Sequence, residues 1–346
     1  MESDTLFVAQ EVKTKTMIIN KKTFFRIEIL SLHIFSLTIL YMIAYASMRT
    51  DIPAFYSDWL LRRIEECFVM VRSPYNDHLI YKLPFNPEVI DCLGFCTKDP
   101  GKMIPYLDAL KNWKTLWHVT ITPYGKEYEP GVRDKREIVS AFKNLSLRVG
   151  KDRVVWRYDP VFLSPLFSIS SHKIWFSTLS SLLEGYTDRV IFSFLDIYPF
   201  LKDNMQRLGI RAPEKSEMEE LASFFVEEGR KHGLVVSSCA EGDWMKAFGV
   251  DTSGCLTKDV WEKCAERKLN FPNKKGKRSE CNCILGFDIG GYGGCGMKCV
   301  YCYGRNYDRN EVHNPLSPLL FGWPGEEDKI KEVKAESWAD KDGWLI

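Results

Sequence analysis

The chain has 346 residues, of which 45% are hydrophobic and 13% aromatic, and its formal net charge is +1. This composition predicts a sizeable folded core and excludes an intrinsically disordered chain. A net charge near zero also argues against a protein that attracts nucleic acid or anionic membranes through its overall field. The length suits two average domains or one (β/α)-barrel with extensions.

An apolar segment follows a polar N-terminal stretch. We expect residues 1–40 to form an extension that is poorly ordered or apolar. Residues 27–46 are apolar apart from Glu28 and His33, and this length is sufficient to consider a membrane span. Residues 38–46 read equally well as a buried strand. Membrane anchoring is therefore the less favoured alternative, and a cytoplasmic location is expected.

Strand-like segments then alternate with helical patterns. Eight segments read as strands, at residues 38–46, 67–71, 89–96, 116–122, 153–158, 189–195, 234–239 and 283–289. Alternation of this kind is typical of a parallel sheet covered by helices. We predict an α/β fold, a TIM-like (β/α)-barrel over residues 41–310, in preference to an open doubly wound sheet. Residues 311–346 are expected to form a C-terminal tail.

Three cysteines, Cys295, Cys299 and Cys302, follow the last predicted strand within eight residues. The chain has eleven cysteines, an odd number clustered late, which favours metal ligation in a reducing compartment over disulfides. Thiolates at this CxxxCxxC spacing can hold three irons of a [4Fe–4S] cluster and leave the fourth iron open to a small molecule. The alternative is structural zinc, with Cys281 or Cys283 as the fourth ligand.

Four further cysteines lie outside this loop, namely Cys239, Cys255, Cys281 and Cys283. The last two point to the same side if their segment is extended, because strand side chains alternate. Four thiolates could bind zinc or a second cluster. The alternative is that some of them are ordinary buried thiols, which pack as small hydrophobic groups.

Polar side chains follow most of the predicted strands, where the chemistry of a (β/α)-barrel is found. The catalytic candidates are Arg157, Asp159 and Glu241, and the cofactor-binding candidates are Arg49, Asp51 and Thr122. Arg157 and Asp159 stand at i, i+2 after an apolar strand, so both point to one side if the strand continues. Arg157 could bind a carboxylate there, or the two could form a structural pair.

The cysteine loop resembles the cluster loop of radical S-adenosylmethionine (SAM) enzymes, with Tyr301 at the aromatic position. The resemblance implies that Tyr301 lies against the adenine of SAM. In typical members the loop follows the first barrel strand and a Gly-Gly-Glu element is present. Here the loop follows the last predicted strand, and we find no Gly-Gly-Glu element.

A wider resemblance rests on four segments, residues 49–56 (RTDIPAFY), 120–125 (TITPYG), 156–160 (WRYDP) and 299–303 (CVYCY). Together they are similar to the DUF1848 family, prokaryotic proteins of unknown function with a cysteine cluster near the C-terminus. The likeness extends from about Tyr41 to Gly322. It implies an iron–sulfur protein related to radical SAM enzymes.

These resemblances imply an enzyme that binds SAM at the open iron and acts on an unknown small-molecule substrate. A reductant such as ferredoxin or flavodoxin would supply the electron. The alternative is a non-catalytic iron–sulfur or zinc protein with a redox or structural role. Nucleic-acid binding is not expected, because no aromatic residues are interleaved in the basic run at residues 274–278.

Overall fold

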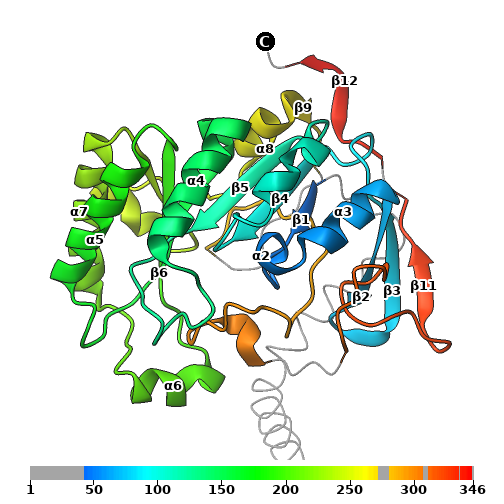
Figure 1. Ribbon diagram of the computed structural model, residues 1–346. Helices are drawn as coiled ribbons and strands as arrows, with labels where there is room; N and C mark the ends of the chain where they lie inside the picture. Colours follow the sequence, from blue (N-terminus) through cyan, green and yellow to red (C-terminus); the bar gives the residue numbers. More distant parts are fainter. Residues whose placement is uncertain (1–42, 272–279, 307–310, 335, 345–346) are drawn as a thin grey trace, which may run out of the picture.

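The computed structural model describes residues 43–271, 280–306, 311–334 and 336–344. Its main element is a seven-stranded sheet in the order β10-β1-β4-β5-β6-β7-β8, and every neighbouring pair is parallel (Figure 1). These strands are β1 (Ile43–Ala46), β4 (Cys92–Thr97), β5 (Thr115–Thr120), β6 (Val154–Val161), β7 (Arg189–Phe194), β8 (Val235–Ser238) and β10 (Phe287–Asp288). The predicted α/β class with a parallel sheet is confirmed.

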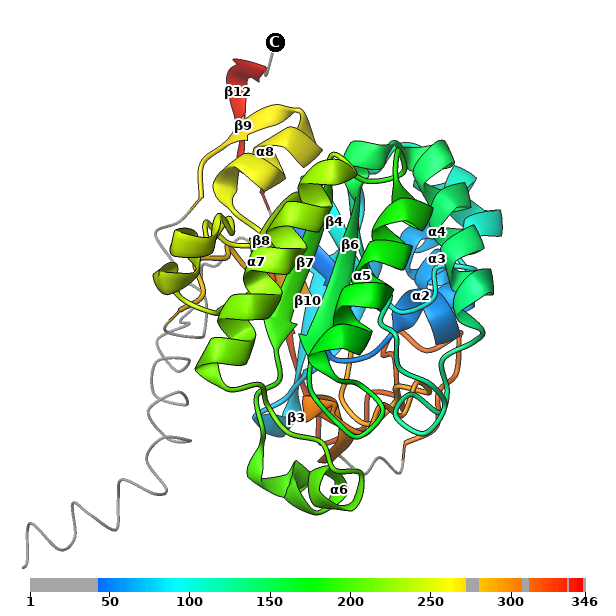
Figure 2. The same ribbon diagram turned by 90° about the vertical axis from the view of Figure 1, so that its left-hand side faces the viewer.

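The sheet is buried on both faces, as expected for parallel strands. Neighbouring residues of one strand point to opposite faces. Trp117 and Trp156 therefore pack in one cluster of buried side chains, and Leu116 and Val155 in another. The first cluster lies beneath helices that Figure 2 shows side by side over one face, α4 (Lys135–Val149), α5 (Ile169–Leu183) and α7 (Lys215–Lys231).

The helices begin at residues that suit helix N-termini. Asp134 accepts a hydrogen bond from the amide of Arg136 at the start of α4, and Ser168 accepts one from Ser171 at the start of α5. Such side chains satisfy amide groups that have no partner inside the helix. At the other end of α4, Gly150 has φ +98°, a conformation that glycine adopts without strain.

The second cluster includes a ring contact between Tyr45 of β1 and Trp261 of α8 (Lys258–Ala265). Their centroids are 5.5 Å apart in an edge-to-face arrangement. Gly94 of β4 allows this packing, because a Cβ there would lie 2.6 Å from the Tyr45 ring. This face is therefore closed by segments from the C-terminal half of the chain.

The expected assignment of residues 67–71 to the main sheet is wrong. They contribute to β2 (Phe68–Ser73), which pairs antiparallel with β3 (Asn76–Pro84) in a separate sheet completed by β11 (Lys329–Glu332). The two residues between β2 and β3 suffice for an antiparallel hairpin, whereas a parallel pair needs a long crossover. The main sheet consequently has seven strands in the described part of the chain, where eight were predicted.

The remaining elements are short. They are the helices α2 (Ile52–Phe55), α3 (Ser57–Glu65) and α6 (Lys202–Arg207), and the strands β9 (Arg267–Leu269) and β12 (Ala339–Trp344), which pair with each other. Most of the apolar N-terminal segment lies outside the described residues, but its last four residues form β1. Over the portion of the chain that is described, none of the helices has the length and apolar character to cross a membrane.

Candidate functional site

The cysteine loop docks on the segment that follows β5. The amide of Val300 donates to the carbonyl of Tyr128 at 3.0 Å, and the amide of Gly131 donates to the carbonyl of Met297 at 2.9 Å. The backbones approach so closely that a Cβ on Gly131 would lie 2.0 Å from the carbonyl oxygen of Gly296. These contacts place the loop at the carboxyl end of the sheet, where ligands bind in α/β proteins.

The three thiols of this loop are close to one another. Cys299 is buried, Cys295 and Cys302 are half-buried, and all three interact electrostatically. The amide of Gly304 donates to Sγ of Cys302 at 3.3 Å, and the amide of Met297 hydrogen-bonds Cys295. Amide donors aimed at sulfur are among the interactions that tune iron–sulfur clusters. The donor set therefore fits such a cluster.

Burial raises the pKa of Cys295 and of Cys299 to about 12. Both are therefore protonated thiols at neutral pH until a metal binds. Over the described ranges, no three His, Cys, Asp or Glu side chains already stand at the spacing of ligands to one metal ion. Metal binding at the loop would thus be coupled to proton release and to small movements of the sulfurs.

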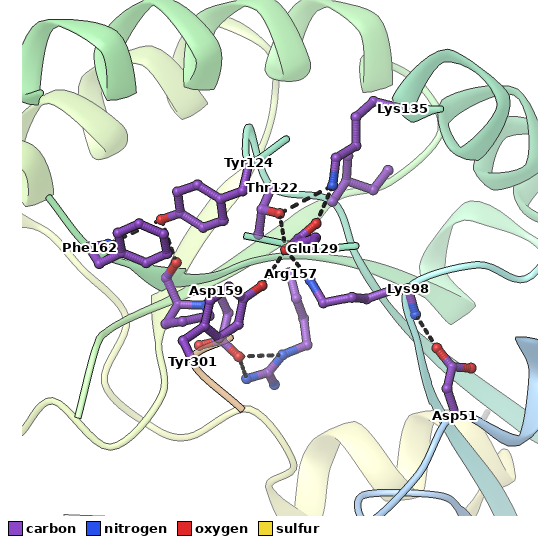
Figure 3. Close-up of polar contacts among 12 residues, drawn as sticks. Asp51, Lys98, Thr122, Tyr124, Glu129, Lys135, Arg157, Asp159, Phe162 and Tyr301 are labelled. Carbon is purple, nitrogen blue, oxygen red and sulfur yellow. Dashed lines mark hydrogen bonds and ion pairs between the residues drawn. The ribbon is translucent and has the colours of Figure 1, made fainter. Parts of the chain in front are cut away.

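Glu129 lies directly behind the loop, with a side chain that is 0% exposed. Lys98 donates to its carboxylate at 2.8 Å and Thr122 at 2.7 Å, and Lys135 and the hydroxyl of Tyr301 also donate to it (Figure 3). Burial alone would raise the pKa of Glu129, but the two lysines lower it to about 2. Thr122 thus takes part in this network.

The two lysines have different surroundings. The carboxylate of Glu129 outweighs burial and raises the pKa of Lys98, whereas burial lowers the pKa of Lys135, with Lys98 adding repulsion. Two lysines and one carboxylate leave an excess positive charge, and Lys98 interacts electrostatically with Cys299. This charge favours negatively charged thiolates at the loop.

Tyr301 is buried, with 7% of its surface exposed. Its ring packs against Tyr124 and Phe162, with centroids 5.9 Å and 5.6 Å away, and Nζ of Lys98 lies 5.7 Å from its centroid. Together with the hydrogen bond to Glu129, these contacts give Tyr301 an anchoring role in the loop.

Arg157 and Asp159 form a half-buried pair at the carboxyl end of β6. Nη2 and Nε of Arg157 lie 2.5 Å and 3.2 Å from Oδ2 of Asp159, and the hydroxyl of Ser193 donates to the other carboxylate oxygen. Asp159 also interacts electrostatically with Lys98, which places the pair at the same end of the sheet as the loop. Burial opposes the charge of Arg157, but Asp159 and nearby thiols raise its pKa well above the usual value.

Arg49 and Asp51 are engaged within the fold. Arg49 donates to the carbonyl of Asp288 at 2.8 Å and lies over the ring of Tyr292. Asp51 caps α2 through the amide of Ala54 and accepts bonds from the hydroxyl of Thr97 and the amide of Lys98, and burial raises its pKa to about 6. The geometry thus gives Asp51 a structural role.

Glu241 lies beyond β8, and its carboxylate accepts a bond from the amide of Phe194 at 2.8 Å. Burial raises the pKa of Glu241 to about 7, with repulsion from Asp196 and Asp159 adding to the shift. The carboxyl group of Glu241 can therefore gain or lose a proton near neutral pH, as a general acid or base requires.

The other four cysteines also come together. Sγ of Cys255 lies 3.2 Å from Sγ of Cys283, the thiols of Cys239 and Cys255 are hydrogen-bonded, and so are those of Cys281 and Cys283. A hydrogen bond from Cys283 lowers the pKa of Cys281 to about 7. These thiols form a second group, separate from the cysteine loop.

A hollow of about 290 Å³ lies elsewhere, lined by residues such as Arg153, Asp188 and Cys264. It opens at the amino ends of β6 and β7, opposite the cysteine loop. The hollow is therefore not part of the candidate site.

Comparison with known proteins gives a family match over most of the chain. A family model described as a domain of unknown function, DUF1848, matches residues 43–304. Neither the curated proteins nor the solved structures include a significant match to the chain. The matched range begins at β1 and ends just after the cysteine loop.

Proposed function

The chain belongs to the DUF1848 family, and from this premise we propose that it is an iron–sulfur enzyme of the radical SAM type. Cys295, Cys299 and Cys302 would hold a [4Fe–4S] cluster and leave one iron for SAM. The observation that carries the proposal is the loop itself, three interacting thiols with amide donors, docked at the carboxyl end of a parallel sheet. The substrate is an unknown small molecule.

Lys98 and Tyr301 would prepare the site for the cluster. Lys98 supplies positive charge beside Cys299, which offsets the negative charge of bound thiolates. Tyr301 is fixed by its hydrogen bond to Glu129, and its side chain is also hydrogen-bonded to Cys299. The resemblance to radical SAM enzymes puts the adenine of SAM against Tyr301. With 7% exposed, only a small part of the ring is open to such a contact.

Arg157, Asp159 and Glu241 would orient SAM or the substrate. Asp159 occupies Nε and Nη2 of Arg157, which leaves Nη1 for a ligand carboxylate. Glu241, with its pKa near neutrality, would hold or accept a proton at its carboxylate. Arg49 would steady the end of β10 that leads into the loop, through the carbonyl of Asp288.

The cofactors would supply the difficult chemistry. Held by Cys295, Cys299 and Cys302, a cluster that receives one electron from a reductant such as ferredoxin or flavodoxin would supply radical chemistry, the removal of hydrogen from the substrate.

We also propose that the sheet closes into a (β/α)-barrel between β8 and β10. Supporting this, the amide of Ser238 donates to the carbonyl of Asp251, and the amide of Ile284 donates to that of Leu256. Residues 251–256 therefore lie beside β8 at one end and beside the approach to β10 at the other. The order of the strands, in which β10 lies next to β1, is the order of a closed barrel.

The test is anaerobic reconstitution of the full chain with iron and sulfide, followed by EPR with and without SAM and an assay for 5′-deoxyadenosine. We expect a cluster signal that changes with SAM and product that is lost in Cys299→Ala. Cys67→Ala is the matched control, because Cys67 is exposed and far from the loop in sequence. A cluster that forms without any response to SAM would support the redox or structural alternative instead.

A further inference from the structure

The second group of thiols joins three separate segments of the chain. Cys239 directly follows β8, Cys255 lies in the segment beside β8, and Cys281 and Cys283 precede β10. Cys255 and Cys283 are buried, and the other two are half-buried. The group therefore lies between the two strands that end the main sheet.

The contacts between the sulfurs suit one metal ion. Sγ of Cys255 is 3.2 Å from Sγ of Cys283, and each of these thiols is hydrogen-bonded to one further cysteine. Four sulfurs around a single zinc ion, each about 2.3 Å from the metal, lie roughly 4 Å apart. In an iron–sulfur cube each thiolate binds a different iron, which separates the sulfurs further. The short contacts thus favour a single ion over a cluster.

A buried hydroxyl near the same thiols is left without a hydrogen bond. Tyr45 is 2% exposed, its hydroxyl has no partner among the described residues, and it interacts electrostatically with Cys255 and Cys283. Buried polar groups in folded proteins almost always have a partner. A metal-bound thiolate would accept this hydrogen bond.

The electrostatic surroundings also suit bound thiolates. A divalent ion with four thiolates carries two net negative charges, which are costly to bury without compensation. The guanidinium of Arg157 is half-buried and interacts electrostatically with the thiols of Cys239 and Cys255. Its positive charge would offset part of the negative charge of the zinc ion and its four thiolates.

We propose that Cys239, Cys255, Cys281 and Cys283 bind one zinc ion that ties the end of β8 to the start of β10. As the thiols now stand, no three described side chains have the spacing of ligands to one ion. Binding would therefore draw Cys239 and Cys281 towards the central pair. This site is independent of the proposed cluster at Cys295, Cys299 and Cys302.

The experiment measures metal by mass spectrometry in the full chain purified from zinc-supplemented cells. We expect one zinc per chain in the parent protein and a loss of at least tenfold in Cys255→Ser and in Cys283→Ser. Cys264→Ser is the matched control, because Cys264 is a buried cysteine in the same cluster of side chains. Cys299→Ala should keep its zinc, which separates this site from the cysteine loop.

X-ray absorption at the zinc edge of the parent protein covers the case in which the serine variants fail to fold. We expect four sulfur ligands at about 2.3 Å. Nitrogen or oxygen ligands, a parent protein without stoichiometric zinc, or full zinc retention in a folded Cys283→Ser would each overturn the proposal. So would iron and sulfide that remain in Cys299→Ala and disappear in Cys283→Ser, because they would assign these thiols to a second cluster.

Discussion

The hydroxyl of Tyr301 donates a hydrogen bond to the carboxylate of Glu129, a residue 172 positions earlier in the chain. The same carboxylate binds Lys98 and Lys135, which follow β4 and begin α4. The position of the cysteine loop is therefore fixed by a buried charge that belongs to the first half of the sheet.

Tyr301→Phe should destabilise the protein by about 1.5–3 kcal/mol, the usual range for a hydrogen bond to a charged group. The change keeps the ring that packs on Tyr124 and Phe162. Tyr303→Phe is the control, because the Tyr303 hydroxyl donates to the neutral carbonyl of Met48. Its loss should cost about 0.5–1.5 kcal/mol. Urea unfolding of both variants provides the measurement, and equal costs would contradict the prediction.

Glu129→Gln should cost about 3–5 kcal/mol, because it leaves two cations at a largely buried site without their counter-charge. Glu266→Gln is a matched control. Glu266 also pairs with two cations, Lys114 and Arg153, but its side chain is 52% exposed. Exposed pairs contribute about 0–1 kcal/mol. The measurement is the free energy of unfolding in guanidinium. An equal loss in both variants would show that burial of Glu129 does not strengthen its ion pairs.

His172 should make stability depend on pH. It is fully buried, accepts a hydrogen bond from the Tyr158 hydroxyl at Nδ1 and donates from Nε2 to the carbonyl of Phe162, which requires the neutral ring. Burial lowers its pKa from 6.5 to about 4. Between these values the unfolded chain takes up a proton and the folded protein does not. Stability should therefore fall as the pH drops from 6.5 to 4, by up to about 3 kcal/mol.

The measurement for His172 is the free energy of unfolding at several pH values for the parent and for His172→Gln. The variant should lose most of the slope between pH 6.5 and 4. His78→Gln should keep it, because the His78 side chain is 67% exposed. A parent slope that persists in His172→Gln would assign the effect to other groups.

Gly131→Ala should separate the cysteine loop from the segment after β5. The added Cβ would lie 2.0 Å from a backbone oxygen and 2.8 Å from Cα of Met297, and neither atom belongs to a flexible side chain. We expect a cost of at least about 1–3 kcal/mol and reduced iron retention after reconstitution. Gly304→Ala is the control within the loop, because its nearest neighbour would be 3.6 Å away. Equal iron retention in the two variants would argue against the close approach.

Much of the fold could be predicted from the sequence. The apolar strands of the main sheet, the helices between them and the family can all be recognised in the sequence, and the structure and the family match confirm them. The hairpin of β2 and β3 could not be predicted, because the sequence of an isolated apolar strand carries no information about which strand it pairs with. Only the short turn between the two strands indicates an antiparallel pair, and none of the predicted strands covers β3.

The candidate site, like the fold, could be predicted from the sequence only in part. The polar residues at strand ends, Arg157 and Asp159, could be identified because they continue an apolar strand. Glu129 could not, because it lies in an irregular segment rich in proline and glycine, where periodicity gives no signal. Lys98 follows a strand, but in the sequence it cannot be distinguished from a solvent-exposed lysine at the start of a loop. Its role depends on a carboxylate that only the folded chain brings near.

The late position of the cysteine loop has a consequence for how the protein is made. A ribosome adds about 5–20 residues per second, and N-terminal parts fold first. The strands from β1 to β8, with Glu129 and its two lysines, would leave the ribosome before Cys295 is added. Tyr301 would then form its hydrogen bond with a Glu129 carboxylate that is already part of the folded sheet region. Loading of the proposed cluster would therefore be confined to chains whose synthesis has passed the last cysteine, and prematurely terminated chains would remain without it.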